Sequence, residues 1–249
     1  MLGVGLDQLR ELDRLKTEFV DAVGRQLRAP LTSIRGYLEL LRDDDVDLAA
    51  DLVHRCLDVI DRNSRHLAGL VEDLLILSRL DSSRPGPPTG RVSVPEVVAH
   101  AVSVVRPEVE KADQMISVWF DDLVPPVTGD PDQIERVVIN LLSNAVKFSP
   151  TASAAPIEVS VSGQSGQSGQ VSILVRDHGI GIAGPDQDRI FTRFYRSSQA
   201  RERGVPGTGL GLAVVKEIVD AHAGTISLTS APGRGTTVVV TFPAEPPVA

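Results

Sequence analysis

The sequence predicts an α+β protein in which a long helical segment precedes a domain with helices on one face of a sheet. Three observations predict it. Apolar residues recur at three- and four-residue steps through the N-terminal part, as in amphipathic helices. A stretch rich in Pro, Gly and Ser then follows. Beyond it, helical and strand-like segments alternate over 92–243, which favours a layered α+β domain.

The N-terminal part contains two apolar stripes, at 6–42 and 48–77, separated by the acidic turn 43–45. Pro30 lies inside the first stripe and should kink the helix, because it removes a backbone donor. Two long helices with one narrow apolar seam each cannot bury those seams alone. We therefore expect domain 1–82 to form a two-helix hairpin that dimerises into a four-helix bundle.

The remaining boundaries follow from composition. We place a linker at 83–91, because SSRPGPPTG at 82–90 is typical of a domain connection, and a disordered tail at 244–249. SGQSGQSGQ at 162–170 is too small and polar to pack and should connect a hairpin. The elements expected between linker and tail are helices at 94–109, 131–148 and 210–221 and strands at 115–120, 157–161, 171–175, 225–228 and 236–242.

Composition excludes several classes of function. The 25 Lys and Arg residues against 33 Asp and Glu residues give a net charge of -8, which argues against non-specific nucleic-acid binding. The single cysteine, Cys56, excludes an internal disulfide and is expected to be a small buried hydrophobe. No run in this chain approaches the roughly 18 to 20 apolar residues of a membrane helix. We expect a cytoplasmic location.

The helix expected at 131–148 carries an unusual polar face. Asn140, Asn144 and Lys147 follow one another at i, i+4 and i+7 and share that face. Asparagine is a mediocre residue inside a helix, because its side chain competes for backbone hydrogen bonds. The pattern fits a ligand site and also fits a solvated polar face, so this helix alone leaves both interpretations open.

Three glycine-rich segments favour a nucleotide site. RDHGIGI at 176–182 places an acid before two alternating glycines at the end of a strand. GVPGTGLGL at 204–212 opens a helix with glycines that allow backbone amides to approach a phosphate. PGRGTT at 232–237 is a third turn, leading into a strand. Their spacing matches neither the P-loop nor the Rossmann fingerprint.

Together and in this order, the motifs resemble the catalytic domain of sensor histidine kinases, which has the Bergerat ATP-binding fold shared with gyrase. NLLSNAVKFS resembles the N box of that family, DHGIGI its first glycine box, IFTRFYR its F box and GTGLGL its second glycine box. The resemblance covers nearly the whole chain from Leu15 onward. It implies a Bergerat-type α/β sandwich over 92–243 that binds ATP with Mg2+.

The resemblance implies a role for each motif residue. Asp177 would accept the adenine amino group, an acceptor-for-donor pairing that discriminates against guanine. Gly179 and Gly181 would let the backbone close on the base. Asn144 would offer its amide oxygen to Mg2+, a hard ligand for a hard cation, and Asn140 would support the same site.

Other motif residues would contact the phosphates. Lys147 would bring positive charge to them, and the second glycine box would wrap the triphosphate at a helix N-terminus. The segment 193–205 would form a mobile lid, although its arginines fit a solvated surface equally well. The set that the resemblance assigns to ATP comprises Asn140, Asn144, Lys147, Phe148, Asp177, Gly179, Gly181, Ile182, Phe191, Arg196, Gly207, Thr208, Gly209, Leu210, Gly211, Leu212 and Thr236.

FVDAVGRQLRAPLTSI at 19–34 resembles the H box, the phosphorylated helix of the family, but departs from it where the chemistry lies. Arg25 stands where the phosphorylated histidine belongs, and its guanidinium has no free lone pair. Gln26 replaces the acid and cannot act as a general base. Ala29 replaces a threonine or asparagine and cannot orient a water. We expect no autophosphorylation on this helix.

Three functions therefore remain open. The chain could bind ATP and phosphorylate the H-box histidine of a partner kinase, in a heterodimer or a two-protein system. It could instead be a pseudokinase, a nucleotide-sensing homodimeric or heterodimeric scaffold that regulates a kinase or a response regulator receiver domain. An ATPase or serine-kinase role is the third, and the H-box helices argue against it.

Overall fold

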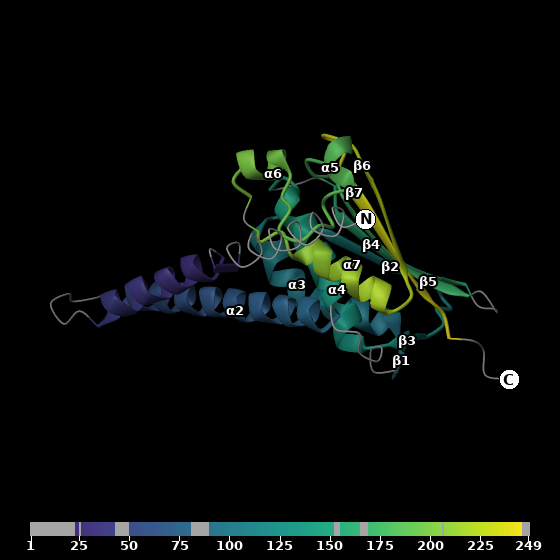
Figure 1. Cartoon of the computed structure of the whole chain (residues 1–249), viewed down its shortest axis with the longest axis horizontal. Helices are drawn as coiled ribbons and strands as arrows, with labels where there is room; N and C mark the ends of the chain where they lie inside the picture. Colours follow the sequence, from purple (N-terminus) through teal and green to yellow (C-terminus); the bar gives the residue numbers. More distant parts are fainter. Residues whose placement is uncertain are drawn as a thin grey trace, which may run out of the picture. The chain divides into compact units, whose positions relative to one another are not determined.

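The computed structural model of the 249-residue chain describes residues 23–24, 26–42, 50–80, 90–151, 155–164, 169–205 and 207–245 (Figure 1). It divides into two compact units, with the boundary between Ser78 and Arg79. None of the helices in the described ranges combines the length and the apolarity that a membrane crossing requires.

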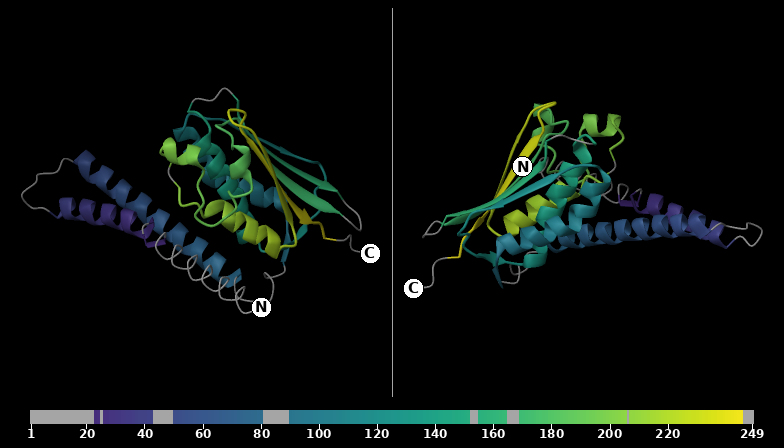
Figure 2. Two further views of the ribbon diagram at one scale, coloured as in Figure 1. Left: turned by 45° about the horizontal axis from the view of Figure 1, so that its top comes forward. Right: turned by 180° about the vertical axis from the view of Figure 1, so that it is seen from behind.

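The first unit is the expected helical hairpin. Residues 26–41 are helical and lie beside α2 (Ala50–Leu80), as Figure 2 shows. Asn63 Nδ2 of α2 lies 3.4 Å from Ser33 Oγ and donates a hydrogen bond across the pair. Pro30 continues the helix and is buried. Cys56 is fully buried, which confirms its predicted role as a small hydrophobe.

The second unit is built on a five-stranded sheet in the order β2-β4-β5-β7-β6, in which only the β2–β4 pair is parallel. The strands are β2 (Ile116–Phe120), β4 (Ile157–Gln164), β5 (Gln170–Asp177), β6 (Thr225–Ser230) and β7 (Thr236–Pro243). The antiparallel pairing of β4 with β5 confirms the hairpin predicted around the polar repeat.

One face of this sheet is the core face. Cross-strand partners such as Val159 with Val175 and Ile173 with Val240 are buried, as the period of two along each strand requires. Helices α4 (Pro131–Phe148) and α7 (Gly211–Ala221) pack on that face, and α3 (Val94–Lys111) packs on α4 (Figure 2). The prediction of helices on one face is confirmed.

Helix α4 has the predicted bounds because its sequence defines both ends. The Asp130 carboxylate accepts hydrogen bonds from the N–H groups of Asp132 and Gln133, and Pro131 occupies the first turn, where no donor is needed. Its apolar residues, among them Ile134 and Leu142, are buried against the sheet and α3.

A small second sheet corrects two predicted boundaries. β1 (Gly90–Val92) pairs antiparallel with β3 (Val127–Gly129), so the last two residues of the predicted linker 83–91 belong to a strand. Ala244 forms a bridge with Val127, and Arg91 lies 3.1 Å from the Glu245 carboxylate. The predicted disordered tail 244–249 is therefore wrong for its first two residues, because long-range pairing holds them.

Candidate functional site

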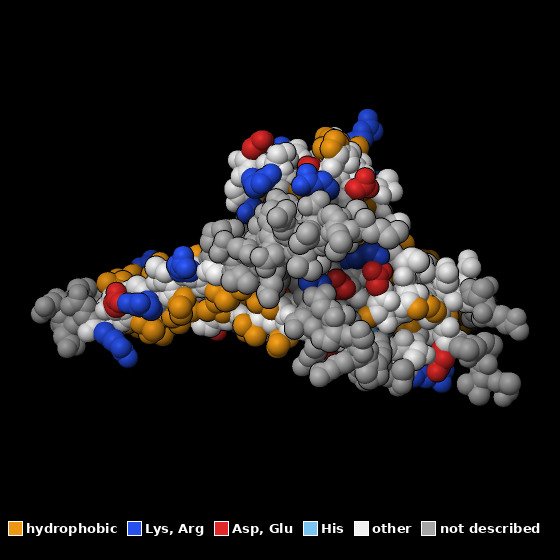
Figure 3. All heavy atoms as spheres, viewed as in Figure 1, with side chains coloured by type: hydrophobic (Ala, Val, Ile, Leu, Met, Phe, Trp, Pro, Cys, Tyr) orange, Lys and Arg blue, Asp and Glu red, His pale blue; other side chains and the backbone are white. Residues whose placement is uncertain are grey.

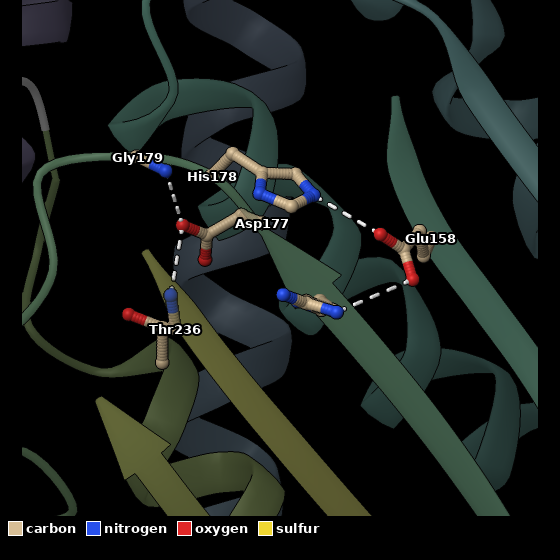
Figure 4. Close-up of polar contacts among 6 residues, drawn as sticks. Glu158, Asp177, His178, Gly179 and Thr236 are labelled. Carbon is tan, nitrogen blue, oxygen red and sulfur yellow. Dashed lines mark hydrogen bonds and ion pairs between the residues drawn. The ribbon is translucent and has the colours of Figure 1, made fainter. Parts of the chain in front are cut away.

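The carboxylate of Asp177 lies where β5 ends and β7 begins, because Asp177 and Thr236 are register partners. Its Oδ1 accepts the N–H of Gly179 at 2.8 Å and the N–H of Thr236 at 3.1 Å (Figure 4). The side chain is buried, and Oδ2 accepts no hydrogen bond from any described residue. One oxygen is thus fixed by the fold, and the other remains free for a ligand.

Burial raises the pKa of the Asp177 carboxyl above its ordinary value of 3.8, because removal from water penalises the charged form. The N–H groups of Gly179 and Thr236 and the nearby His178 lower the pKa, but less strongly than burial raises it. His178 itself points away toward Glu158, whose carboxylate lies 3.0 Å from its Nε2 (Figure 4).

The loop after Asp177 follows a path that only glycine permits at two points. Gly181 has φ +67°, and a Cβ there would overlap the carbonyl of Ala231. A Cβ on Gly179 would overlap the carbonyl of Phe148, the last residue of α4. These contacts bring the loop against both the helix and the turn before β7.

Backbone hydrogen bonds join the same three segments. The Ile180 N–H donates to Phe148 O at 3.1 Å, the Gly233 N–H to Ile180 O at 2.7 Å and the Gly235 N–H to Gly179 O at 3.1 Å. The first glycine segment, the third glycine segment and the end of α4 therefore form one backbone-lined wall beside Asp177.

Two residues that sequence reasoning missed support this wall. Ser230 Oγ accepts the N–H of Ile182 at 2.8 Å and donates to Gly235 O at 2.8 Å. Gln187 Nε2 donates to Ile182 O at 3.0 Å and to Ser230 O at 2.9 Å. A serine ending a strand and a glutamine in a short helix carry no motif, so no sequence signal could have found them.

The residues on the polar face of α4 differ in whether their side chains already have partners within the protein. Asn140 Nδ2 donates to Arg136 O at 3.0 Å, and Gly211 of α7 packs so closely on Asn140 Oδ1 that a Cβ would lie 2.7 Å from it. Asn144 is half-buried, and its amide has no partner among the described residues; Lys147 is exposed. Asn140 therefore joins two helices, whereas Asn144 and Lys147 are available to a ligand.

The second glycine segment meets the segment that precedes it. Gly209 has φ +74° and packs against the backbone of Phe194, whose N–H donates to Gly209 O at 2.9 Å. Arg193 Nη2 lies 3.0 Å from Glu217 Oε1 on α7, and Arg196 donates to Val205 O. These contacts attach the predicted lid segment to α7 and to itself.

The N-terminus of α7 follows directly from the second glycine segment. Thr208 Oγ1 accepts the N–H of Leu210 at 3.1 Å, and Leu210 is buried. The helix begins at Gly211, so its first N–H groups, which lack partners within the helix, follow the glycines in sequence. This is the arrangement of backbone donors that anions favour.

Comparison with known proteins identifies the family of both parts of the chain. Residues 129–246 match the family described as "Histidine kinase-, DNA gyrase B-, and HSP90-like ATPase", and residues 15–83 match the His Kinase A (phospho-acceptor) domain. The solved structure of the mycobacterial sensor histidine kinase MprB is 30% identical with a TM-score of 0.52, and the match covers 64% of this chain and 99% of that one.

The chain belongs to the sensor histidine kinase family.

Longer curated relatives support the assignment. The histidine kinase chain is 35% identical over 238 residues to the sensor-like histidine kinase SenX3 of Mycolicibacterium smegmatis, covering 94% of this chain and 59% of that protein. It is 36% identical over 234 residues to the sensor histidine kinase WalK of Bacillus subtilis, covering 94% of this chain and 37% of that protein. The chain thus spans only part of the length of the curated relatives it matches.

The solved histidine kinase AdeS of Acinetobacter baumannii shares the fold, with a TM-score of 0.63, 24% identity and coverage of 88% of this chain and 97% of that one. The predicted fold class, an N-terminal helical part followed by an α+β domain of the histidine kinase type, is confirmed.

The structure brings together part of the predicted ATP set. Asp177 accepts hydrogen bonds from Gly179 and Thr236, Gly179 packs on the carbonyl of Phe148, and Gly181 extends the same loop. Ile182 joins that cluster through Ser230, Gly211 contacts Asn140, and Gly209 contacts the F box. Among the described residues, no hydrogen bond connects Asp177 with Lys147, Phe191, Arg196, Gly207 or Leu212.

The H-box positions lie in the other unit. Arg25 is outside the described residues. Gln26 is half-buried and Ala29 exposed, both within the helical run 26–41.

The described residues hold no group of three or more His, Cys, Asp or Glu side chains that could bind a metal ion alone. Asn144, with its unpartnered amide oxygen, is the predicted magnesium ligand that the structure leaves free. A cation here would take its other ligands from phosphate oxygens and water, which is how Mg2+ is commonly held.

We predict that Gly181→Ala lowers the free energy of unfolding by about 3 kcal/mol, because it combines a positive φ with backbone overlap. Gly184→Ala is the matched control, since a Cβ at Gly184 meets no atom within 4 Å and its φ is not positive. Urea unfolding of both variants checks this. Equal stability of the two would contradict the geometry of the loop.

Replacing Asp177 by asparagine should stabilise the protein at neutral pH. The raised pKa means that the folded state holds the Asp177 proton more tightly than the unfolded state. The stability from this group is therefore present below the ordinary value of 3.8 and is lost as the pH rises through the higher folded pKa. In Asp177→Asn the amide oxygen can keep both accepted bonds without the charge.

Thermal unfolding from pH 3 to 8 tests this expectation. The melting temperature of Asp177→Asn should exceed that of the wild type at neutral pH, and the difference should shrink toward pH 3. A variant that is less stable than the wild type at pH 7 would show that the carboxylate stabilises the fold.

Proposed function

We propose that this chain binds ATP with Mg2+ at the Asp177 site and transfers the γ-phosphoryl group to the H-box histidine of a partner kinase, not to its own helix. The observation that carries the proposal is the buried Asp177 carboxylate with one oxygen free. That oxygen would accept the exocyclic amino group of adenine, whereas guanine would present a carbonyl there and be repelled.

The glycine loop supports binding of the base at this point. A Cβ at Gly179 would lie 2.9 Å from Asp177 Oδ1 and would overlap Phe148 O, so glycine at this position lets the loop pass close to the carboxylate. A solved structure with the same fold, full-length ShkA, is described as a complex with AMPPNP; it is 22% identical with a TM-score of 0.64 and covers 96% of this chain and 47% of that one. An ATP analogue therefore occupies a protein of this fold.

The phosphates would lie toward the N-terminus of α7. Its first N–H groups supply donors, and Lys147 supplies a positive charge that no described residue neutralises. Asn144 Oδ1 would be the protein ligand of Mg2+, and the metal would neutralise charge developing on the transferred group. Phosphoryl transfer depends mainly on such positioning and charge, so these groups would supply what the chemistry requires.

The phosphoacceptor must come from elsewhere. The guanidinium of Arg25 cannot attack phosphorus, because it has no free lone pair at neutral pH. Gln26 cannot take a proton from an attacking imidazole. A partner with an intact H box would provide both groups.

The helical hairpin offers a surface for that partner. Leu31, Leu38, Leu57, Val71 and Leu75 are between 39% and 53% exposed in the single chain. Figure 3 shows hydrophobic side chains gathered along the hairpin. A second hairpin would cover them in a four-helix bundle, either in a homodimer or in a heterodimer with another histidine kinase.

The second candidate is a pseudokinase that senses nucleotide and regulates a kinase or a response regulator without transferring phosphate. The replacements at Gln26 and Ala29 favour it, because the phosphotransfer base and the residue for dephosphorylation are lost along with the histidine. The two candidates differ in whether phosphate reaches a partner protein.

A transfer experiment separates them. We predict that the chain, mixed with labelled ATP and a partner kinase whose own ATP site is inactivated, places acid-labile, base-stable phosphate on the partner histidine. Asn144→Ala should reduce the yield by more than about 10-fold, because the metal loses its protein ligand. Ser143→Ala, adjacent on α4 and bonded to Glu108, is the matched control. Absence of label on the partner would favour the pseudokinase.

A restoration experiment tests the nucleotide domain by itself. We predict that Arg25→His with Gln26→Glu gives measurable autophosphorylation, since it returns the nucleophile and the base to the H box. Arg25→Ala with Gln26→Glu is the control without a nucleophile and should stay unlabelled. If the restored variant binds ATP and still takes no label, the domain is not competent for transfer.

A further inference from the structure

Gln114 is a buried polar residue that lies outside every motif. It precedes β2, and only 8% of its surface is exposed. Its Nε2 lies 3.2 Å from Val146 O, 3.4 Å from Ser149 O and 3.2 Å from Pro150 O. These carbonyls belong to the last turn of α4 and the residues after it, where helical carbonyls lack partners within the helix. One amide group thus closes the C-terminal end of α4.

The orientation of this amide is fixed by its surroundings. Nε2 carries two hydrogens, shared here among three carbonyl oxygens. The opposite orientation would place Oε1 against the same oxygens and give repulsion without any donor. Oε1 is buried and has no hydrogen-bond partner among the described residues. A buried acceptor without a partner is unfavourable, so this amide makes its three contacts at the cost of one unsatisfied oxygen.

The end of α4 that Gln114 holds is the end that supports the site. Phe148 lies between the bonded carbonyls, and its own carbonyl accepts the Ile180 N–H at 3.1 Å. Gly179 packs directly on that carbonyl and donates its N–H to Asp177 Oδ1. A continuous series of contacts therefore leads from Gln114 through Phe148 to the loop beside Asp177.

From these contacts we infer that Gln114 is a positioning residue for the nucleotide site: its amide clamps the C-terminal turn of α4 so that Phe148 holds the first glycine loop against Asp177. The consequence for nucleotide rests on the proposed function, whereas the consequence for the loop does not. The hydrogen bonds of the Gln114 side chain go to Val146, Ser149 and Pro150, none of which is proposed to contact adenine or Mg2+, so its effect passes through the helix end.

The chain offers a matched control on the same helix. Gln133 lies at the opposite end of α4, where its Nε2 donates to Asp130 Oδ2 at 3.0 Å. Gln133→Ala also removes a glutamine amide that supports one end of α4, here by bonding the N-cap residue Asp130, but at the end away from the glycine loop. General weakening of α4 would affect both variants, and loss of the clamp would affect only the variants of Gln114.

The experiment compares Gln114→Ala, Gln114→Met and Gln133→Ala in nucleotide-free protein by amide hydrogen exchange. We expect the Ile180 amide to exchange about 10-fold faster in both Gln114 variants, with Val240 in β7 as the reference for global opening. Methionine has about the length of glutamine but donates no hydrogen bond and adds no buried charge, so it tests the contact even if the alanine variant fails to fold. Gln133→Ala should leave Ile180 unchanged.

Affinity for ADP is the second measurement. The Gln114 variants should bind ADP about 10-fold more weakly, and Gln133→Ala should bind it as the wild type does. Either of two results would overturn the inference. One is exchange at Ile180 within about twofold of the wild type in both Gln114 variants, and the other is an equal rise in exchange in Gln133→Ala. Faster exchange at Ile180 together with no ADP binding by the wild type would support the clamp and reject the proposed function.

Discussion

The nucleotide half of the molecule depends on one buried carboxylate. Asp177 Oδ1 takes N–H groups from Gly179 and Thr236, and so ties the end of β5 to the loop that follows it and to the start of β7. Burial raises the pKa of the group, which means that the fold holds this charge at some expense of stability. An acceptor kept in an unfavourable place with one oxygen free is typical of a binding site.

Around this carboxylate the wall of the site is made of backbone. Gly179, Gly181 and Gly235 lie so close to neighbouring carbonyls that any side chain would overlap them. The sheet and α4 fix where these glycine segments meet, and the N-terminus of α7 follows the second glycine segment. Ser230 and Gln187 hydrogen-bond to the backbone of the first glycine segment, and Gln114 hydrogen-bonds to carbonyls at the end of α4.

The two units differ in whether they keep the chemical groups that their motifs normally supply. The sheet unit retains a free acceptor, a free amide oxygen and helix N–H donors, which together suit a magnesium nucleotide. The helical unit has a guanidinium and an amide where phosphorylation needs a nucleophile and a base, and a methyl group where dephosphorylation needs a residue that orients water. Its exposed leucines nevertheless provide a surface for a second hairpin. This combination favours action on a partner.

The sequence by itself determined the elements with strong local signals. Asp130, Pro131 and an apolar period of 3.6 residues define α4. An acid followed by alternating glycines marks the end of β5. Only the tertiary structure decided which strands pair with β1, that Glu245 lies beside Arg91, and that Gln114 closes α4. A three-residue strand has no measurable period, and a side chain that bonds residues more than 30 positions away leaves no local trace, because long-range packing alone creates those contacts.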